Sequence, residues 1–367
     1  MAEVVTVRGP ISADALGITM CHVHVLSELK VAEQAKPPAT MTEAELALLH
    51  HPVTTEMLGT IRRHANDACA IDNNLLGDID LAIIELNAYK KMGGSSIVET
   101  SVVGLKRDPV GLRRISDATG VNIICGTGWY IGGSHPPVTR QSSIEQLSGI
   151  MVRELTAGIE DTGIRAGFIK AGLSGPTPDV PFQGAEEKVL RAGARAQAAT
   201  GATMTMHPCH HYGRARHLHT YLDILQKEGA NLNKCYMSHM EFWHRDIDYQ
   251  KSLLDRGITL SYDQFGCEEY VRPGWSKAPD SARVEAVVKL VEMGYSRQIV
   301  LSNEVVSKFR LRKYGGLGYS HLLENIVPDL KYCGVTAHIF PTSEAVSEAL
   351  LFSQSPANVS SRISARV

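Results

Sequence analysis

The sequence has no excess of charge of either sign and no long apolar run. Its 367 residues carry 37 Lys and Arg against 39 Asp and Glu, so the formal net charge is −2. Without a strongly positive field, nucleic acid and anionic membrane surfaces are not expected as main partners. No stretch approaches the roughly 18 apolar residues of a membrane span, and the N-terminus lacks a basic region followed by an apolar one. We therefore expect no membrane association and a cytoplasmic location.

Paired cysteine motifs are also missing. The seven cysteines are scattered, their number is odd, and none forms a Cys-x-x-Cys pair. This pattern indicates neither a disulfide framework nor a cysteine-based zinc site, and it favours small buried hydrophobic residues. The content of 44% hydrophobic and 21% charged residues is that of an ordinary globular domain, which can bury its core without such supports.

What the sequence does contain is a repeated pattern of short apolar runs followed by segments of helical spacing. The runs are short and apolar, which is typical of fully buried parallel strands. The segments between them, such as Glu186–Ala199 and Arg283–Met293, have apolar residues three and four positions apart. Eight runs alternating with helices predict an α/β fold, the (β/α)8 TIM barrel. The runs are Gly17–His24, Ser95–Thr100, Val121–Thr127, Ile164–Lys170, Ala202–His207, Lys234–His239, Ile258–Tyr262 and Gln298–Ser302.

The alternative of a doubly wound sheet requires a glycine-rich turn after the first run. The sequence there is His-Val-His-Val-Leu-Ser-Glu, which disfavours it. We predict one domain over residues 1–354, with a partly helical loop insertion at about 30–75 over the active-site face, and a polar C-terminal tail over 355–367. Two further long connections, Ile131–Ser143 and Gly266–Ser281, follow the third and seventh runs.

The first candidate functional residues are two histidines at the end of the first run. Strand side chains alternate, so His22 and His24 point to the same face. Two imidazoles at one strand end form half of a metal site. The alternative is a pair of hydrogen-bonded structural histidines.

Four more polar residues end predicted strands, which is where barrel enzymes place their catalytic groups. They are Lys170, His207, His239 and Glu304. A lysine in this position is costly to bury as a bare ammonium. It either pairs with another group or reacts with carbon dioxide to form a carbamate, an anion that can bridge two metal ions.

Other histidines are expected in solvated loops rather than in contact with substrate. Four of them follow the fifth run and two lie in the predicted insertion. They are His210, His211, His217, His219, His50 and His51.

Several motifs carry a family resemblance that spans Val4 to about Gly334. They include Thr-Val-Arg-Gly-Pro-Ile with the two-histidine strand, the approach to Lys170, Gly-Thr-Gly-Trp-Tyr, Ser-His-Met and Leu-Ser-Asn-Glu. In these the chain resembles the phosphotriesterase family of the amidohydrolase superfamily. The segment Lys313–Pro328 is similar to one found in its phosphotriesterase-related and lactonase-like branches.

The resemblance implies a binuclear metal centre in a hydrolase. His22 and His24 would bind the more buried ion, His207 and His239 the more exposed one, and a carboxylated Lys170 would bridge them. Zinc is the expected metal, with manganese, iron and cobalt as alternatives.

The resemblance also assigns roles to two catalytic residues. Glu304 stands where the family usually has an aspartate that binds metal and handles protons, and Tyr130 matches a tyrosine near the metals and the substrate. Gln264 stands where lactonase-like members often carry arginine, which weakens the case for a homoserine lactone.

The implied reaction is attack by a metal-bound hydroxide on a small-molecule carboxyl ester, lactone or amide, in preference to a phosphotriester. The alternative is a non-hydrolytic biosynthetic enzyme or a ligand-binding protein that uses the same scaffold with a modified centre. As family members are often dimers, a homodimer is expected.

Overall fold

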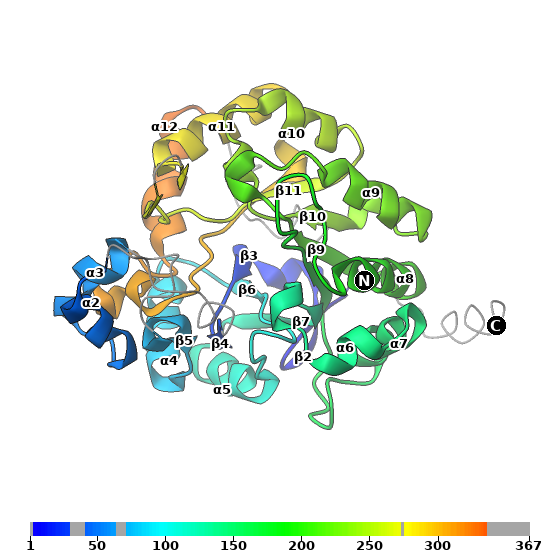
Figure 1. Cartoon of the computed structure of the whole chain (residues 1–367), viewed down its shortest axis with the longest axis horizontal. Coiled ribbons are helices and arrows are strands. Elements are labelled where there is room, and N and C mark those ends of the chain that lie inside the picture. The colour runs from blue at the N-terminus through cyan, green and yellow to red at the C-terminus, as the bar shows by residue number, and fades with distance from the viewer. Residues whose placement is uncertain (1–2, 30–40, 64–70, 273–274, 336–367) are drawn as a thin grey trace.

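Eight parallel strands form the centre of the molecule, and helices surround them (Figure 1). The computed structural model describes residues 3–29, 41–63, 71–272 and 275–335. The sheet order β3-β6-β7-β8-β9-β10-β11-β14 follows the chain, which confirms the predicted (β/α)8 barrel. Each predicted run overlaps one strand. The strands are β3 (Thr19–Val23), β6 (Ser96–Glu99), β7 (Asn122–Trp129), β8 (Phe168–Gly172), β9 (Thr203–His207), β10 (Cys235–Met237), β11 (Thr259–Tyr262) and β14 (Ile299–Leu301).

An outer helix follows each strand along the chain. In one example, the Asp108 side chain accepts a hydrogen bond from the Gly111 amide at the start of α5, and Gly120 ends the helix with a φ of 69°. The helices are α4 (Ile79–Lys91), α5 (Pro109–Thr119), α7 (Ile144–Thr156), α8 (Glu186–Thr200), α9 (Leu218–Lys227), α10 (Ile247–Leu254), α11 (Asp280–Glu292) and α12 (Val327–Tyr332). The main core lies between these helices and the outer faces of the strands.

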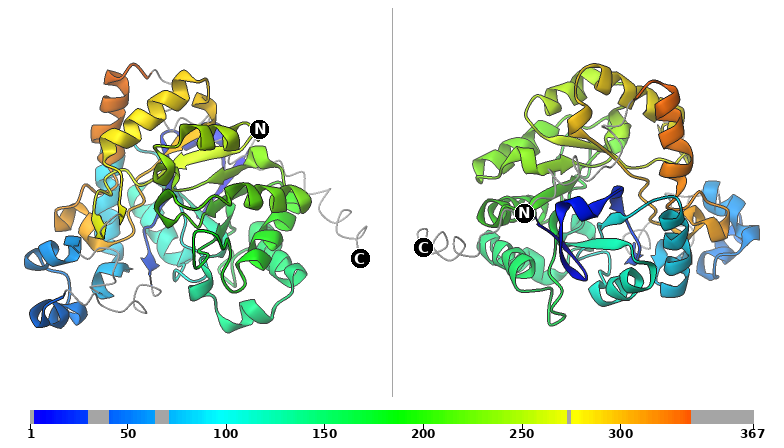
Figure 2. Two further views of the ribbon diagram at one scale, coloured as in Figure 1. Left: turned by 45° about the horizontal axis from the view of Figure 1, so that its top comes forward. Right: turned by 180° about the vertical axis from the view of Figure 1, so that it is seen from behind.

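The inside of the barrel is apolar at its N-terminal end. Val4 and Leu16 pack there with side chains from five strands, which are Cys21, Val98, Ile124, Phe168 and Val300. The hairpin of β1 (Glu3–Thr6) and β2 (Gly9–Ser12) lies across this end, as the view from behind shows (Figure 2). With this end filled, the polar side chains of the strands gather at the opposite, C-terminal end.

The seam between the first and last strands lies beside the candidate site. Between β3 and β14 the Ser302 hydroxyl accepts from the His22 amide at 3.1 Å and donates to the His22 carbonyl at 2.6 Å. The Glu304 amide also donates to the His22 carbonyl at 3.2 Å. The bonds that join the two strands therefore also fix the backbone of two predicted metal ligands.

The insertion after β3 is partly helical, as predicted. Its described part contains β4 (Ser27–Glu28), α2 (Glu43–Ala47), α3 (Leu58–Arg63) and β5 (Leu75–Leu76). It packs through Met57 and Ile61 against Phe309 in the segment after β14. Figure 1 shows α2 and α3 at the edge of the barrel, so these two helices lie beside the active-site face rather than over it.

The remaining long connections contain short elements of their own. Ile131–Ser143 includes α6 (Pro137–Gln141), and Gly266–Ser281 includes the hairpin of β12 (Tyr270–Arg272) and β13 (Trp275–Ser276).

The predicted polar tail over residues 355–367 lies outside the described residues. In the part of the chain that is described, no helix has the length and apolar character needed to cross a bilayer. The described cysteines are free and, except for Cys333, buried, as expected.

Candidate metal centre

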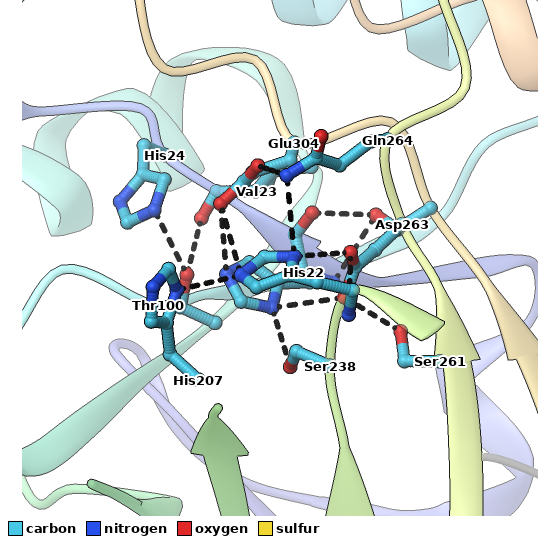
Figure 3. A network of polar contacts seen from close by, with 12 residues as sticks. His22, Val23, His24, Thr100, His207, Ser238, Ser261, Asp263, Gln264 and Glu304 are labelled. Atoms are coloured by element: carbon cyan, nitrogen blue, oxygen red, sulfur yellow. Dashed lines mark hydrogen bonds and ion pairs between the residues drawn. The ribbon is translucent and has the colours of Figure 1, made fainter. Parts of the chain in front are cut away.

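The structure brings the seven residues predicted for the site to one end of the barrel. Each lies in a strand or within three residues of its end. His22 and His24 come from β3, Tyr130 from β7, Lys170 from β8, His207 from β9, His239 from β10 and Glu304 from β14. Figure 3 shows His22, His24 and Glu304 converging with His207 from across the barrel.

His22 and His24 have their Nδ1 atoms engaged by neighbouring side chains. His22 Nδ1 lies 2.9 Å from Ser238 Oγ and 3.2 Å from an Asp263 oxygen. His24 Nδ1 lies 2.8 Å from Ser101 Oγ. Such contacts fix the ring orientation. The other nitrogen of each ring, Nε2, lies 3.6 Å from Glu304 Oε1 in His22 and 3.3 Å from Thr100 Oγ1 in His24.

His207 and His239 face each other from adjacent strands. His207 Nδ1 lies 2.6 Å from His239 Nε2, and the other ring nitrogen of His239 lies 2.6 Å from Asp263 Oδ1. His239 adopts the left-handed φ of 62°, a conformation that non-glycine residues rarely hold and that is typical of functional sites. The two rings therefore meet through the nitrogens with which neighbouring histidines can bind a metal ion.

Glu304 joins the two histidine pairs. Its Oε1 lies 3.6 Å from His22 Nε2 and 3.5 Å from His239 Nε2. Its Oε2 accepts a hydrogen bond of 2.8 Å from the Gln264 amide. Two groups with metal-binding spacing therefore share this carboxylate. The first is His22, His24 and Glu304, and the second is His207, His239 and Glu304.

Lys170 is completely buried beside these ligands. Its Nζ lies 3.4 Å from His22 Nε2, and the side chain is 0% exposed. Burial lowers the pKa of Lys170 to about 8, so more of it is neutral amine near neutral pH than for an ordinary lysine. Gly128 allows this close packing, because a Cβ there would lie 2.0 Å from the Lys170 carbonyl oxygen.

Burial also favours neutral imidazoles. The pKa values of His22, His24 and His207 are all lowered by burial and by neighbouring positive charge. Burial opposes the charge on His239 as well, but Asp263 and Glu304 outweigh it and raise the pKa of His239 to about 9. Neutral imidazoles are the form that binds metal, so His239 would have to lose a proton when an ion binds.

Tyr130 lines the pocket beside His207 and Lys170. Its ring centroid is 5.3 Å from that of His207, and Lys170 Nζ lies 5.5 Å from the ring. Burial raises the pKa of Tyr130, with Glu304 as a second cause, so its hydroxyl stays protonated at neutral pH and can donate a hydrogen bond.

Asp263 is a site residue that the sequence analysis missed. It is buried immediately after β11 and contacts both His22 and His239. Burial opposes its ionisation, but the two histidines lower its pKa, so it is a carboxylate that orients one ligand from each pair. Its position at the end of the seventh strand is the same signal that identified Lys170 and His207.

The expectation that His210 lies in a solvated loop is wrong. Its ring stacks on Phe242 with centroids 3.8 Å apart and lies 6.0 Å from the ring of His207. The turn after β9 directs it inward, which a single sequence does not reveal. His211 and His219 instead contact the Gly175 carbonyl and the Ser252 hydroxyl.

A pocket of about 190 Å³ opens over the ligands. This is smaller than the ~300–1,000 Å³ usual for drug-sized ligands, so it suits a small substrate. A larger hollow of about 680 Å³ beside α10 and α11 contains none of the predicted ligands. The smaller pocket is lined by His24, Leu29, Leu105, Tyr130, His207, His210, Phe242, Gln264, Lys277, Glu304, Val306 and Arg310.

Fold and site together define an α/β barrel with a histidine- and carboxylate-rich centre at its strand ends. The profile of the Phosphotriesterase family matches residues 2–342, and the chain belongs to that family. An N-acetyltaurine hydrolase of Tetraodon nigroviridis is 36% identical over 342 residues, which cover 91% of this chain and 93% of the relative.

Solved structures agree with this assignment. A resiniferatoxin-binding protein from Rhodobacter sphaeroides is 32% identical, with a TM-score of 0.87 over 95% of this chain and 94% of that one. A lactonase from Listeria monocytogenes has a TM-score of 0.73 and 21% identity, over 96% of this chain and 100% of that one, and supports the fold alone.

Proposed function

We propose that the protein is a binuclear metal-dependent hydrolase that cleaves short N-acyl amides. The observation that carries this proposal is the Glu304 carboxylate, which lies within reach of two separate histidine pairs. One carboxylate between two pairs of imidazoles provides ligands for two neighbouring ions. A site for one structural ion would not need both pairs.

The donor set fits divalent ions that accept nitrogen and oxygen ligands. His22 and His24 would hold one ion, His207 and His239 the other, and Glu304 would lie between them. Zinc is the first candidate, followed by manganese, iron and cobalt. When bound, the ions would supply Lewis acidity towards the substrate oxygen and make a nucleophile available at neutral pH.

Lys170 would complete the set after carboxylation. A neutral amine is the form that attacks carbon dioxide, and a pKa of about 8 makes that form available. The N–C bond forms, one proton leaves, and the product is an anion. The neutral amine beside His22 thereby becomes a carbamate anion, a charge that two cations would stabilise.

Glu304 and Tyr130 would carry the proton and orientation roles. Gln264 holds Glu304 Oε2, so Oε1 is directed at the histidines, where a carboxylate can accept the proton of the attacking water. The same group would return it to the leaving amine. The protonated Tyr130 hydroxyl would donate to the substrate and orient its scissile group.

The choice of an amide rests on the relatives. Proteins named N-acetyltaurine hydrolase match more than nine-tenths of this chain at 33–36% identity. Esters and lactones follow as substrates, and phosphotriesters come last.

The test is hydrolysis of N-acetyltaurine by protein supplied with zinc or manganese and bicarbonate, with released taurine measured by an amine reagent. We expect turnover, two ions per chain by elemental analysis, and loss of turnover in Lys170→Ala. Tyr130→Phe should retain activity within about tenfold, as expected for one lost hydrogen bond. The proposal would be contradicted if the protein bound no metal under these conditions and hydrolysed no amide, ester or lactone.

A second candidate is a ligand-binding protein on the same scaffold. The similar structure from Rhodobacter sphaeroides is named for binding, which motivates it. Tight binding of an acyl amide with no product over many hours would favour this candidate. Three expectations remain predictions: a homodimer, a small-molecule partner and a cytoplasmic location. Light scattering tests the homodimer.

A further inference from the structure

A buried cation pair lies in the wall of the pocket that His24 and His207 also line. Lys277 Nζ lies 3.1 Å from Glu269 Oε2, and Arg310 Nε lies 3.2 Å from Glu269 Oε1. The Lys277 and Arg310 side chains are only 5% and 10% exposed, and both residues line the pocket. Lys277 and Arg310 thus share the single carboxylate of Glu269.

The charge arrangement is held firmly. Burial opposes ionisation of Glu269, but Arg310 and Lys277 outweigh it and lower the pKa of Glu269 to about 2. The Arg310 guanidinium also donates to the Glu304 carbonyl oxygen at 2.9 Å, which ties the pair to the metal centre. The shared carboxylate therefore holds Lys277 and Arg310 in place, and neighbouring acids raise the pKa of Arg310 against the effect of its burial, so the guanidinium stays charged.

A buried lysine that shares a carboxylate with an arginine keeps hydrogen-bond donors for an anion. The Lys277 ammonium carries three donors. The carboxylate that it shares belongs to Glu269, which is nine-tenths buried and cannot reach bulk solvent. Cations in a partly desolvated pocket bind anions far more strongly than the same groups in water. The other walls offer Leu29, Leu105 and Val306, which suit a short aliphatic linker.

We propose that Lys277 and Arg310 form an anion subsite that binds a sulfonate or carboxylate on the amine half of the substrate. The subsite rests on the proposed function for its orientation, because the acyl carbon must lie at Glu304 while the anion lies at Lys277. The substrate class is then an N-acyl derivative of a short acidic amine, such as N-acetyltaurine or N-acetyl-β-alanine.

The first test compares charged and neutral amides in Lys277→Met, which keeps the chain length and removes the charge. We expect KM for N-acetyltaurine to rise at least about 30-fold, the range for an unpaired buried charge contact. kcat/KM for neutral N-acetylethanolamine should change less than about threefold. Lys277→Arg should restore most of the affinity for the anion. Lys289→Met, which removes an exposed lysine from α11, is the matched control.

Comparison of N-acetyltaurine with N-acetyl-β-alanine in the wild type identifies the preferred anion, since the two differ in sulfonate against carboxylate. An unchanged KM for both acids in Lys277→Met, with the protein folded by circular dichroism, would overturn the subsite.

A binding measurement separates the subsite from the proposed hydrolysis. Propanesulfonate has the anion but no scissile bond, and its binding is measured by calorimetry on the wild type and on Lys277→Met. Binding to the wild type that weakens at least about 30-fold in the variant supports the subsite, even if no amide is hydrolysed and the proposed function fails. Equal binding to both proteins, or none to the wild type, overturns the subsite while amide turnover stands.

Discussion

Two sets of residues surround the pocket, and they are held in different ways. The barrel set lies in strands or within three residues of their ends. The loop set comes from the connections after the strands, where His210 lies three residues beyond β9 and the other members lie at least five residues beyond a strand of the barrel. The barrel set is His22, His24, Lys170, His207, His239 and Glu304, and the loop set is His210, Phe242, Lys277 and Arg310. Strand ladders fix the first set, while side-chain contacts such as the Glu269 pair and the His210–Phe242 stack fix the second.

This difference assigns chemistry to the barrel set and substrate choice to the loop set. A change in the barrel set should lower turnover of every substrate together. A change in the loop set should lower turnover of some substrates and spare others. Substitutions in each set test that division.

His22→Ala should have the largest effect. It removes a ligand of the more buried ion and a neighbour of Lys170, so we expect kcat/KM to fall by at least about 10³-fold for all amides. Bound metal should fall with it in elemental analysis. The control is His50→Ala, in the exposed part of the insertion, and its kcat/KM and metal content should be unchanged. Full activity in His22→Ala would mean that the histidines are merely structural.

Glu304→Asp should come next. The shorter side chain withdraws the carboxylate by roughly an ångström or more, and such a misplacement costs about 10²-fold in rate. Glu304 has a left-handed φ of 32°, which aspartate tolerates well, so the fold should persist in thermal melting. A strong gain of hydrolysis in this variant would show that the natural centre has moved away from hydrolysis.

Asp263→Asn should lower activity by about 10- to 100-fold, as removal of a ligand-orienting carboxylate does. The amide has one acceptor oxygen, so it cannot serve both His22 and His239, each of which faces its own Asp263 oxygen. Metal titration should show weaker binding of both ions. Asp255→Asn, at the exposed end of α10, is the control. Unchanged metal affinity would exclude the orienting role.

His210→Ala should have the smallest effect and the most selective one. It removes the ring packed on Phe242, and an aromatic pair is worth about 0.5–1.5 kcal/mol, which corresponds to up to about tenfold. We expect KM to rise by this factor for some acyl amides, with kcat nearly unchanged. His219→Ala serves as the comparison. An equal fall in kcat for every substrate would place His210 with the barrel set.

The strand ends could be predicted because their signals are local. Alternation along β3 places His22 and His24 together, and the apolar runs locate the strands that carry Lys170 and His207. The same reasoning could have found Asp263, which directly follows β11. Carboxylation, metal identity and assembly depend on chemistry outside the chain, and no residue pattern decides them.

The loop set could not be predicted, because a loop's path depends on contacts distant in sequence. His210 turns inward only because the chain after β9 packs beside Phe242 of the next loop. Lys277 and Arg310 both contact Glu269. Arg310 lies 33 positions after Lys277 in the chain, and Lys277 lies 8 positions after Glu269. In the sequence, Lys277 looks like an ordinary charged loop residue.

The sequence by itself determined the barrel and the residues at its strand ends. Apolar runs and period-two alternation act over a few neighbouring residues, and they require no knowledge of the rest of the chain. Only the tertiary structure decided that Glu304 lies between two histidine pairs and that Lys277 lies in the same pocket. Those distances exist only once β14 closes against β3 and the loops pack, because closure brings together residues hundreds of positions apart.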